Sequence, residues 1–361
     1  MLKKCFSQEN SLFIDLLNSE QFNLYASNPP VFRQAVLSRD TAITHVVIDE
    51  IQRVPELLND IHSIMEGQNP PFFVMSGSSA RKLKRSRANM LGGRAWTIQL
   101  FPLTHVELND MFNLQKSLQW GTLPSVYLET DTAAAQRTLR SYVDTYLREE
   151  IMAEAIVRNI GAFLRFLPLA ADANGMIVNY SNIGRETGVS YNTIKEFFRI
   201  LEDTLLGFFL MPFSRSVRKQ MTKHPKFYLF DTGVQRAMLR KAAVEIAPKT
   251  FEYGKAFEHF IVVEAVRLSS YREKEYAFSF FNTANDAEVD MIIERPDGEI
   301  FAVEIKASDN PAPKTLRGLH SFKQVCDKAH LVCACTTPHP FRHADIAIMP
   351  WKDLFRLLEL A

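Results

Sequence analysis

A short apolar run, Thr44–Ile48, ends in two acids, Asp49 and Glu50. An apolar run of this length that is bounded by polar residues favours a strand buried in a parallel sheet. Within residues 1–115, further short apolar runs alternate with helical segments. This order is typical of a parallel α/β sheet. We expect its strands at residues 12–14, 46–48, 72–75 and 97–100.

The chain has 361 residues, with 42 Lys and Arg against 41 Asp and Glu. This length normally exceeds what one hydrophobic core organises, so we expect two or three domains. The balanced charge indicates neither a nucleic-acid coat nor a membrane surface. The four cysteines suit a reducing compartment, no signal peptide is visible, and the longest apolar run, 205–213, is too short to span a bilayer. We therefore expect a cytoplasmic protein without a membrane partner.

The rest of the chain divides into two segments of different pattern. Residues 116–245 are mainly helical, whereas residues 246–361 begin with a long helix at Phe251 and continue as alternating strands. The sequence thus predicts an α/β protein with three domains: a parallel sheet at 1–115, a helical domain at 116–245 and a second α/β domain at 246–361.

The run that ends in Asp49 and Glu50 has the form of a Walker B element. In proteins with this element, the first acid holds the Mg²⁺ of Mg·ATP through its water shell, and the second polarises the attacking water. Hydrolysis also needs the loop G-x-x-x-x-G-K-[ST], which surrounds the phosphates. The nearest approximation in the 361 residues is Gly254-Lys255, which lacks the upstream glycine and the following Ser or Thr. We expect Mg²⁺ at Asp49 and impaired binding of ATP.

Polar residues after the strand at 72–75 could complete such a site. Ser76 and Ser78 stand where a side chain can hydrogen-bond the γ-phosphate or the attacking water. Arg94 follows two glycines at an expected turn, and its guanidinium could offset charge on a transferring phosphoryl group. The basic residues between 81 and 87 are expected to form a solvated helix face.

Four segments of this region form a family pattern: Val46–Pro55, Ser76–Ser79, Gly93–Ala95 and Leu100–Leu103. They resemble the bacterial and archaeal AAA-type ATPases that carry a C-terminal domain of unknown function. The resemblance continues through Phe227–Gly233 and the last hundred residues, so it covers nearly the whole chain. In that family a Walker A strand and helix precede the segment that resembles Ser11–Leu17. The resemblance therefore implies a P-loop ATPase sheet without its P-loop, in a truncated or degenerate family member.

The middle segment contains the pattern of a helix-turn-helix. Gly188 can end one helix in the left-handed conformation, and the Ser190 hydroxyl can cap the next helix. An apolar stripe follows, made of Ile194, Phe197, Phe198 and Leu201. Further on, Asp231-Thr232-Gly233 imitates an aspartic protease triplet without its second half, and we interpret Gly233 as a turn residue.

The same pattern resembles a winged helix, whose second helix would expose Tyr191, Asn192, Lys195 and Arg199 to DNA. A basic segment placed like a wing follows, with Arg215, Arg218, Lys219, Lys223 and Lys226. These side chains could neutralise phosphates. Winged helices also serve as protein–protein modules, so DNA contact, a protein partner and self-association all stay open.

Charged residues of the last domain form a second constellation: Glu258 on a helix, Asp290 in an apolar run, and Glu304-Ile305-Lys306. They resemble the PD-(D/E)XK nuclease core. The resemblance implies that Glu258, Asp290 and Glu304 hold Mg²⁺, and that Lys306 orients or activates the water that attacks a phosphodiester.

The loop between the two acidic strands decides whether this site can form. Pro296-Asp297-Gly298 suits a three-residue loop that pairs Arg295 with Glu299, and counting back then sets Asp290 opposite Glu304. A two-residue loop would separate the two acids across the sheet. We expect the three-residue loop.

Three functions of different class fit these patterns. The leading hypothesis is an AAA-type ATPase relative of unknown cellular role, with a defective nucleotide site, a winged helix and a nuclease-like C-terminal domain, for which DNA is one candidate target. The alternatives are a Mg²⁺-dependent DNA nuclease, in which the ATPase remnant is scaffold, and a non-enzymatic DNA or protein adaptor.

Overall fold

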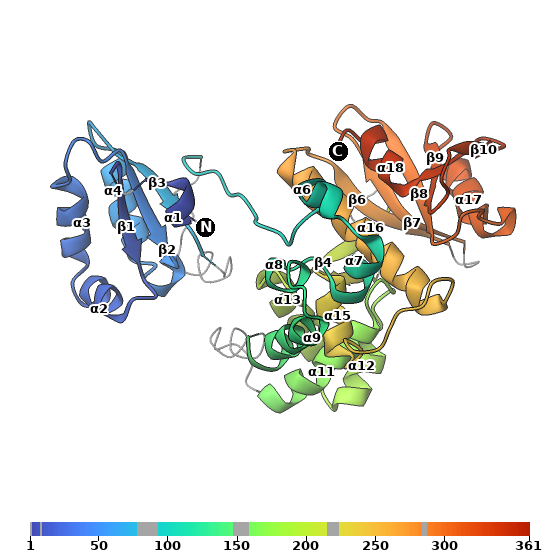
Figure 1. The fold of residues 1–361 in the computed structure, drawn as a ribbon, viewed down its shortest axis with the longest axis horizontal. Coiled ribbons are helices and arrows are strands. Elements are labelled where there is room, and N and C mark those ends of the chain that lie inside the picture. The colour runs from blue at the N-terminus through green and yellow to red at the C-terminus, as the bar shows by residue number, and fades with distance from the viewer. Residues whose placement is uncertain (1, 8, 78–92, 147–158, 215–223, 284–286) are drawn as a thin grey trace. The chain divides into compact units, whose positions relative to one another are not determined.

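The structure is a computed structural model that describes residues 2–7, 9–77, 93–146, 159–214, 224–283 and 287–361. The chain divides into two compact units. The N-terminal unit comprises Met1–Thr97 with Asp203–Leu205, and the C-terminal unit comprises Ile98–Glu202 with Leu206–Ala361. Figure 1 draws both units as ribbons.

The N-terminal unit contains a parallel three-stranded sheet with the order β1-β2-β3. Its strands are β1 (Ser11–Asp15), β2 (His45–Asp49) and β3 (Phe72–Met75). Its helices are α1 (Leu2–Cys5), α2 (Ser19–Ser27), α3 (Pro29–Leu37), the short 3-10 helix η1 (Ile51–Arg53) and α4 (Leu57–Met65). The three strands include the residues expected for the first three strands and pair in parallel, which confirms that part of the prediction. The apolar residues of β2, Val46 to Ile48, are buried.

The fourth expected strand, 97–100, is not formed. Residues 95–100 have no regular secondary structure, and the side chains of Trp96, Ile98 and Leu100 are 91%, 80% and 71% exposed. An extended segment counts as a strand only when a neighbouring strand pairs with its backbone, and no described strand pairs with this one. The prediction was wrong because the alternation of apolar residues does not supply that neighbour.

The first part of the C-terminal unit is helical. It contains α6 (His105–Leu108), η3 (Asn109–Met111), α7 (Leu114–Trp120), α8 (Pro124–Tyr127), α9 (Thr132–Ser141), the π-helical turn η4 (Tyr142–Tyr146), α11 (Ile160–Asp172), α12 (Tyr180–Thr187), α13 (Tyr191–Asp203) and α15 (Thr232–Met238). Apolar residues of α9, α11, α12, α13 and α15 share one buried cluster, which holds these helices together.

The expected helix-turn-helix is present as α12 and α13. Gly188 has a φ of +74°, a left-handed conformation that favours glycine, and it ends α12. The Ser190 hydroxyl accepts a hydrogen bond from the Thr193 N–H at 3.2 Å, at the start of α13. The four apolar stripe residues of α13 are buried. The capping chemistry read from the sequence is therefore confirmed.

The second part of the unit is an eight-stranded mixed sheet with the order β10-β11-β9-β8-β7-β6-β4-β5. Its strands are β4 (Gly207–Pro212), β5 (Lys226–Leu229), β6 (Ala277–Asn282), β7 (Glu288–Glu294), β8 (Ile300–Lys306), β9 (His330–Cys335), β10 (Phe341–His343) and β11 (Ile346–Pro350). Helices α16 (Phe251–Tyr271) and α18 (Trp351–Leu357) share one apolar cluster with the sheet, and α17 (Arg317–Val325), which follows η5 (Pro313–Leu316), shares another (Figure 1).

The antiparallel hairpin of β4 and β5 lies in the middle third of the sequence, yet β4 pairs in parallel with β6 of the last third. One sheet thus continues across both segments. This continuity brings side chains of β5 beside the helix α16, where Tyr228 meets Glu258. In the described part of the chain, no helix has both the length and the apolar character that a membrane crossing requires.

Candidate functional site

Two acids and a serine meet at the carboxyl edge of the N-terminal sheet. Asp49 ends the central strand β2, and Ser76 directly follows the neighbouring strand β3. The Ser76 hydroxyl donates a hydrogen bond to Oδ1 of Asp49 and accepts one from the Glu50 N–H at 3.3 Å. The parallel register brings these residues together, because both strands end at the same edge of the sheet.

Glu50 adopts an uncommon backbone conformation. Its φ is 61° and its ψ is 44°, in the left-handed region that non-glycine residues seldom occupy. Its carboxylate accepts a hydrogen bond at 2.6 Å from the side-chain amide of Gln52, which is 6% exposed. Such a conformation costs of order 1 kcal/mol or more and clusters at functional sites. The carboxylate next to Asp49 is therefore held in place rather than free to turn.

The other expected residues of this site lie elsewhere or outside the described residues. Arg94 contacts Nε2 of His62 at 2.8 Å and Oε1 of Glu66 at 3.2 Å, near the C-terminal end of α4. Ser78 and the basic residues 81–87 fall outside the part of the chain that the structure describes. The structure thus brings together Asp49, Glu50 and Ser76 of the predicted nucleotide-site residues.

The expected DNA-contacting residues of α13 lie on one side of that helix. Asn192 and Arg199 are exposed and Tyr191 is 39% exposed. Lys195 is half-buried, with Nζ 5.9 Å from the ring centroid of Tyr180 and 5.6 Å from that of Tyr191. The expected wing residues Arg215, Arg218, Lys219 and Lys223 fall outside the described residues.

Lys226 does not belong to an exposed wing, and this expectation was wrong. It is the first residue of β5 and only 2% exposed. Its Nζ lies 3.6 Å from Oε1 of Glu258 and forms an ion pair with Glu288. Burial alone would lower the pKa of Lys226, but Tyr228 and the neighbouring carboxylates outweigh it and raise that pKa well above its ordinary value. A single lysine in the apolar run 226–230 was the sequence signal for this buried charge.

The loop between β7 and β8 has the expected three residues. The Arg295 N–H donates to the Glu299 carbonyl at 2.9 Å, and Gly298 has a φ of +90°. Met291 pairs with Val303 in the resulting register, so the next step along both strands is Asp290 and Glu304. The prediction of loop length and strand register is confirmed.

The two acids meet at the ammonium group of Lys306. Its Nζ lies 2.5 Å from Oε1 of Glu304 and 3.6 Å from Oδ2 of Asp290. The same Asp290 oxygen accepts a hydrogen bond from the Ile305 N–H at 2.7 Å. Burial and then the charge of Asp290 raise the pKa of Glu304 well above its ordinary range, against the opposing effect of Lys306.

The donor set at Asp290 and Glu304 fits a divalent cation. Oε2 of Glu304 is buried and has no hydrogen-bond partner, although the residue is only 5% exposed. An unpartnered carboxylate oxygen inside a protein is costly, and Mg²⁺ prefers carboxylate oxygens as ligands. In the described ranges, however, no three His, Cys, Asp or Glu side chains are arranged so that they could hold a metal ion together.

Glu258, the third predicted metal ligand, has other partners. The Tyr228 hydroxyl donates a hydrogen bond to Oε1 of Glu258 at 2.8 Å, and Lys226 approaches the same oxygen. Burial, followed by the charge of Asp290, raises the pKa of Glu258, while Lys226 and the Tyr228 hydroxyl oppose this rise. Both partners of Glu258 come from β5, which the sequence places far from α16.

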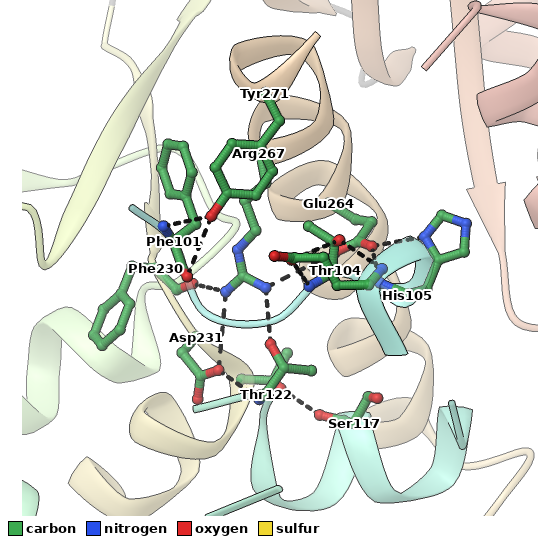
Figure 2. A network of polar contacts seen from close by, with 12 residues as sticks. Phe101, Thr104, His105, Ser117, Thr122, Phe230, Asp231, Glu264, Arg267 and Tyr271 are labelled. Atoms are coloured by element: carbon green, nitrogen blue, oxygen red, sulfur yellow. Dashed lines mark hydrogen bonds and ion pairs between the residues drawn. The ribbon is translucent and has the colours of Figure 1, made fainter. Parts of the chain in front are cut away.

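A second buried charge network was not anticipated (Figure 2). On α16, Glu264 is fully buried and Arg267 is 3% exposed. Oε1 of Glu264 accepts the His105 N–H at 2.5 Å, and Arg267 donates to Thr122 Oγ1 at 2.9 Å. Arg267 also lies 3.9 Å from Asp231. Opposite charges three positions apart in the apolar run 260–268 were the sequence signal for a buried pair.

This network also explains the triplet Asp231-Thr232-Gly233. Asp231 caps α15, because its Oδ1 accepts the N–H groups of Gly233 at 2.9 Å and Val234 at 3.0 Å. Gly233 lies inside α15, where a Cβ atom would stand 1.9 Å from the Trp120 carbonyl oxygen. The interpretation of Gly233 as a turn residue was wrong, since a close approach of two backbones requires glycine there.

Comparison with known proteins finds a matching family model for each of three parts of the chain. Residues 1–109 match the AAA domain, residues 111–245 match a domain of unknown function (DUF8612), and residues 253–354 match another (DUF4143). No solved structure matches the chain.

Similar proteins are known in three bacteria. Uncharacterized proteins of Mycobacterium bovis and Mycobacterium tuberculosis are each 25% identical over 308 residues, which is 84% of this chain and 67% of theirs. An uncharacterized protein of Haemophilus influenzae is 22% identical over 342 residues, 88% of this chain and 81% of its own. The chain therefore carries an AAA-type N-terminal domain followed by two domains of unknown function.

Proposed function

We propose that this AAA-type ATPase-like protein keeps the metal- and water-handling edge of an ATPase core, and that its 361 residues bind and hydrolyse ATP poorly. The observation that carries the proposal is the hydrogen bond between Ser76 and Asp49 at the carboxyl edge of the parallel sheet. In this arrangement Asp49 would hold Mg²⁺ through water, Glu50 would orient the attacking water, and Ser76 would contact that water or the γ-phosphate.

The proposed weakness of ATP binding has a separate cause. When bound, Mg²⁺ neutralises phosphate charge, but most contacts to the β and γ phosphates come from the backbone of a G-x-x-x-x-G-K-[ST] loop. The 361 residues contain no such loop. An acidic edge alone repels the phosphates unless the metal accompanies them.

Calorimetric titration with Mg·ATP tests this proposal. We expect no binding at micromolar concentrations and slow phosphate release that Asp49→Ala reduces further. Glu56→Ala, which removes an exposed carboxylate of the same unit, is the matched control. Micromolar binding of Mg·ATP that Asp49→Ala abolishes and Glu56→Ala preserves would overturn the proposal.

We propose a Mg²⁺-dependent DNA nuclease as the second candidate function, because Asp290, Glu304 and Lys306 converge in the C-terminal sheet. Asp290 and Glu304 would hold the metal, which would supply Lewis-acid activation of water. Lys306 contacts both carboxylates, so it would stand beside that water and orient it. The unpartnered Oε2 of Glu304 supports this assignment.

Nicking of supercoiled plasmid DNA in Mg²⁺ or Mn²⁺ tests the nuclease. Cleavage should disappear in Asp290→Ala and in Lys306→Ala. It should persist in Asp327→Ala and Lys328→Ala, which remove an exposed acid and an exposed lysine of the same unit. If the wild-type chain cleaves no DNA or RNA, the nuclease assignment fails.

Binding to DNA without either activity would indicate a non-enzymatic adaptor built on a winged helix. In that case Asn192→Ala and Arg199→Ala should weaken binding and reduce its dependence on salt concentration. Arg185→Ala, an exposed arginine on the preceding helix, should leave the binding unchanged.

A further inference from the structure

Four carboxylates of the C-terminal unit lie in two pairs, and one lysine contacts each pair. The first pair is Asp290 and Glu304 with Lys306, and the second pair is Glu258 and Glu288 with Lys226. The two lysines differ in their freedom. The Lys306 side chain is 29% exposed, whereas that of Lys226 is 2% exposed.

The surroundings of Lys226 fix its ammonium group in place. The side chain comes from β5, which is the edge strand of the sheet and lies next to β4. Its Nζ lies 5.4 Å from the ring centroid of Phe280, and Tyr228, two residues later on the same strand, holds Glu258 by a hydrogen bond of 2.8 Å. Withdrawal of Lys226 would leave Glu258, whose side chain is 24% exposed, without its cation, which is unfavourable for a mostly buried carboxylate.

Lys306 has a different position. It ends β8, and its side chain is partly exposed, so its ammonium group can shift away from the carboxylates. A divalent cation between Asp290 and Glu304 would take the place of the ammonium group on these carboxylates and satisfy the unpartnered Oε2 of Glu304, with Lys306 left beside the water that it would orient. A cation at Glu258 and Glu288 would instead have to displace a buried lysine.

We infer that Lys226 is a built-in counter-ion for Glu258 and Glu288, so that the centre takes up one divalent cation, at Asp290 and Glu304. This inference rests on the proposed nuclease function. Lys226 is then a positioning residue, because its ion pairs connect Glu258 of α16 with Glu288 of β7. Glu288 lies two residues before Asp290 on the same strand. It also removes Glu258 from the metal ligands that the sequence predicted.

Counting bound Mn²⁺ by electron paramagnetic resonance tests the assignment of ligands. All counts are made in the Asp49→Ala background, which removes the Mg²⁺ ligand proposed for the N-terminal unit. In this background the otherwise wild-type chain should bind one ion and Asp290→Asn none. The charge-neutral variant Lys226→Met/Glu258→Gln/Glu288→Gln should fold, because it leaves no charge unpaired, and should still bind one ion. Two ions in wild type, or none in this triple variant, would overturn the inference.

A second test measures how far Mg²⁺ restores the thermal stability of Lys226→Ala. The comparison between variants does not depend on a cation at Asp290 and Glu304, because all of them keep that pair. Lys226→Ala leaves two carboxylates around a space that a hydrated cation can enter. Its melting temperature should fall below that of wild type, and Mg²⁺ should raise it by more than it raises wild type or the triple variant. An equal rise in all three proteins would contradict the role of Lys226.

The two experiments distinguish a failure of the counter-ion role of Lys226 from a failure of the proposed nuclease function. If wild type binds no Mn²⁺, the nuclease proposal fails, and the Mg²⁺ rescue of Lys226→Ala still decides the role of Lys226. If wild type binds one Mn²⁺ and the triple variant none, the nuclease proposal stands and the inference fails. Should Lys226→Ala not fold in either condition, the ion count of the triple variant decides.

Discussion

The Ser76 hydroxyl joins β3 to the end of β2 by its hydrogen bond to the Asp49 carboxylate. The same hydroxyl accepts the Glu50 N–H at 3.3 Å, so one oxygen serves both acids of the pair. Ser76→Ala removes both hydrogen bonds from partly buried groups. We expect it to destabilise the N-terminal unit by about 1–2 kcal/mol.

Hydrogen exchange of the β2 amides checks this prediction, because local opening of the unit is read there directly. Ser27→Ala, which removes an exposed hydroxyl at the end of α2, should leave the exchange unchanged. Equal exchange in Ser76→Ala and wild type would show that the hydroxyl does not hold the two strand ends.

Replacement of glycine by alanine should have opposite effects on stability at Gly298 and at Gly254. Gly298 has a φ of +90°, whereas Gly254 lies in the first turns of α16 and has a helical backbone. A Cβ atom would meet no heavy atom within 4 Å at either position. Gly298→Ala should therefore destabilise the C-terminal unit by about 1–2 kcal/mol through backbone strain alone, and Gly254→Ala should stabilise it by about 0.5–1 kcal/mol.

Urea unfolding of the two variants beside wild type measures this difference. Gly254→Ala serves as the control for the added methyl group, since it changes the same atoms without a positive φ. If both variants shift in the same direction, backbone conformation does not decide the effect at Gly298.

The strand register at Asp290 and Glu304 could be predicted because it depends on local chemistry. Gly298 selects the loop length, and the loop then fixes every pair along β7 and β8. The start of α13 was predictable for the same reason, since Gly188 and Ser190 act on their own neighbours.

The partners of Lys226 could not be predicted in the same way. They depend on the pairing of β4 with β6, which joins strands more than sixty residues apart in the sequence. The prediction of a strand at residues 97–100 was wrong for a related reason, because their apolar alternation does not indicate which strand would pair with them. Sequence reasoning thus found the charged residues of the C-terminal centre but placed Lys226 in the wrong environment.

Burial of His259 should make the folded chain less stable in acid. It is 2% exposed, its Nε2 lies 2.6 Å from the Leu229 carbonyl oxygen, and burial lowers its pKa from 6.5 to about 4. Between these values the unfolded chain binds a proton that the folded chain does not, so stability falls as the pH decreases from 6.5 to about 4. The loss from this residue is at most about 3 kcal/mol.

His259→Gln keeps a donor for the Leu229 carbonyl and cannot become charged. Its unfolding free energy should depend less on pH in this range than that of wild type, as urea titrations at several pH values would measure. His343→Gln, at an exposed histidine, should follow the wild-type curve. A wild-type curve that His259→Gln does not flatten would mean that other groups govern the acid sensitivity.

Arg267 and Arg137 compare a buried with an exposed ion pair. Arg267 is 3% exposed and lies between Glu264 and Asp231, 3.8 and 3.9 Å from their carboxylates (Figure 2). Arg137 lies 3.5 Å from Asp131 with 68% of its side chain exposed. Arg267→Met leaves two buried acids without their cation and should cost about 3–5 kcal/mol, whereas Arg137→Met should cost less than about 1 kcal/mol.

Urea unfolding followed by circular dichroism measures both losses. The double variant Arg267→Met/Glu264→Gln provides the decisive control, because it removes one of the two uncompensated charges. It should be more stable than Arg267→Met alone, since the penalty comes from the unpaired carboxylate and not from lost packing of the arginine stem. If the double variant is the less stable of the two, the Glu264 carboxylate stabilises the unit through its own hydrogen bonds to His105, and an unpaired charge is not the cause of the loss.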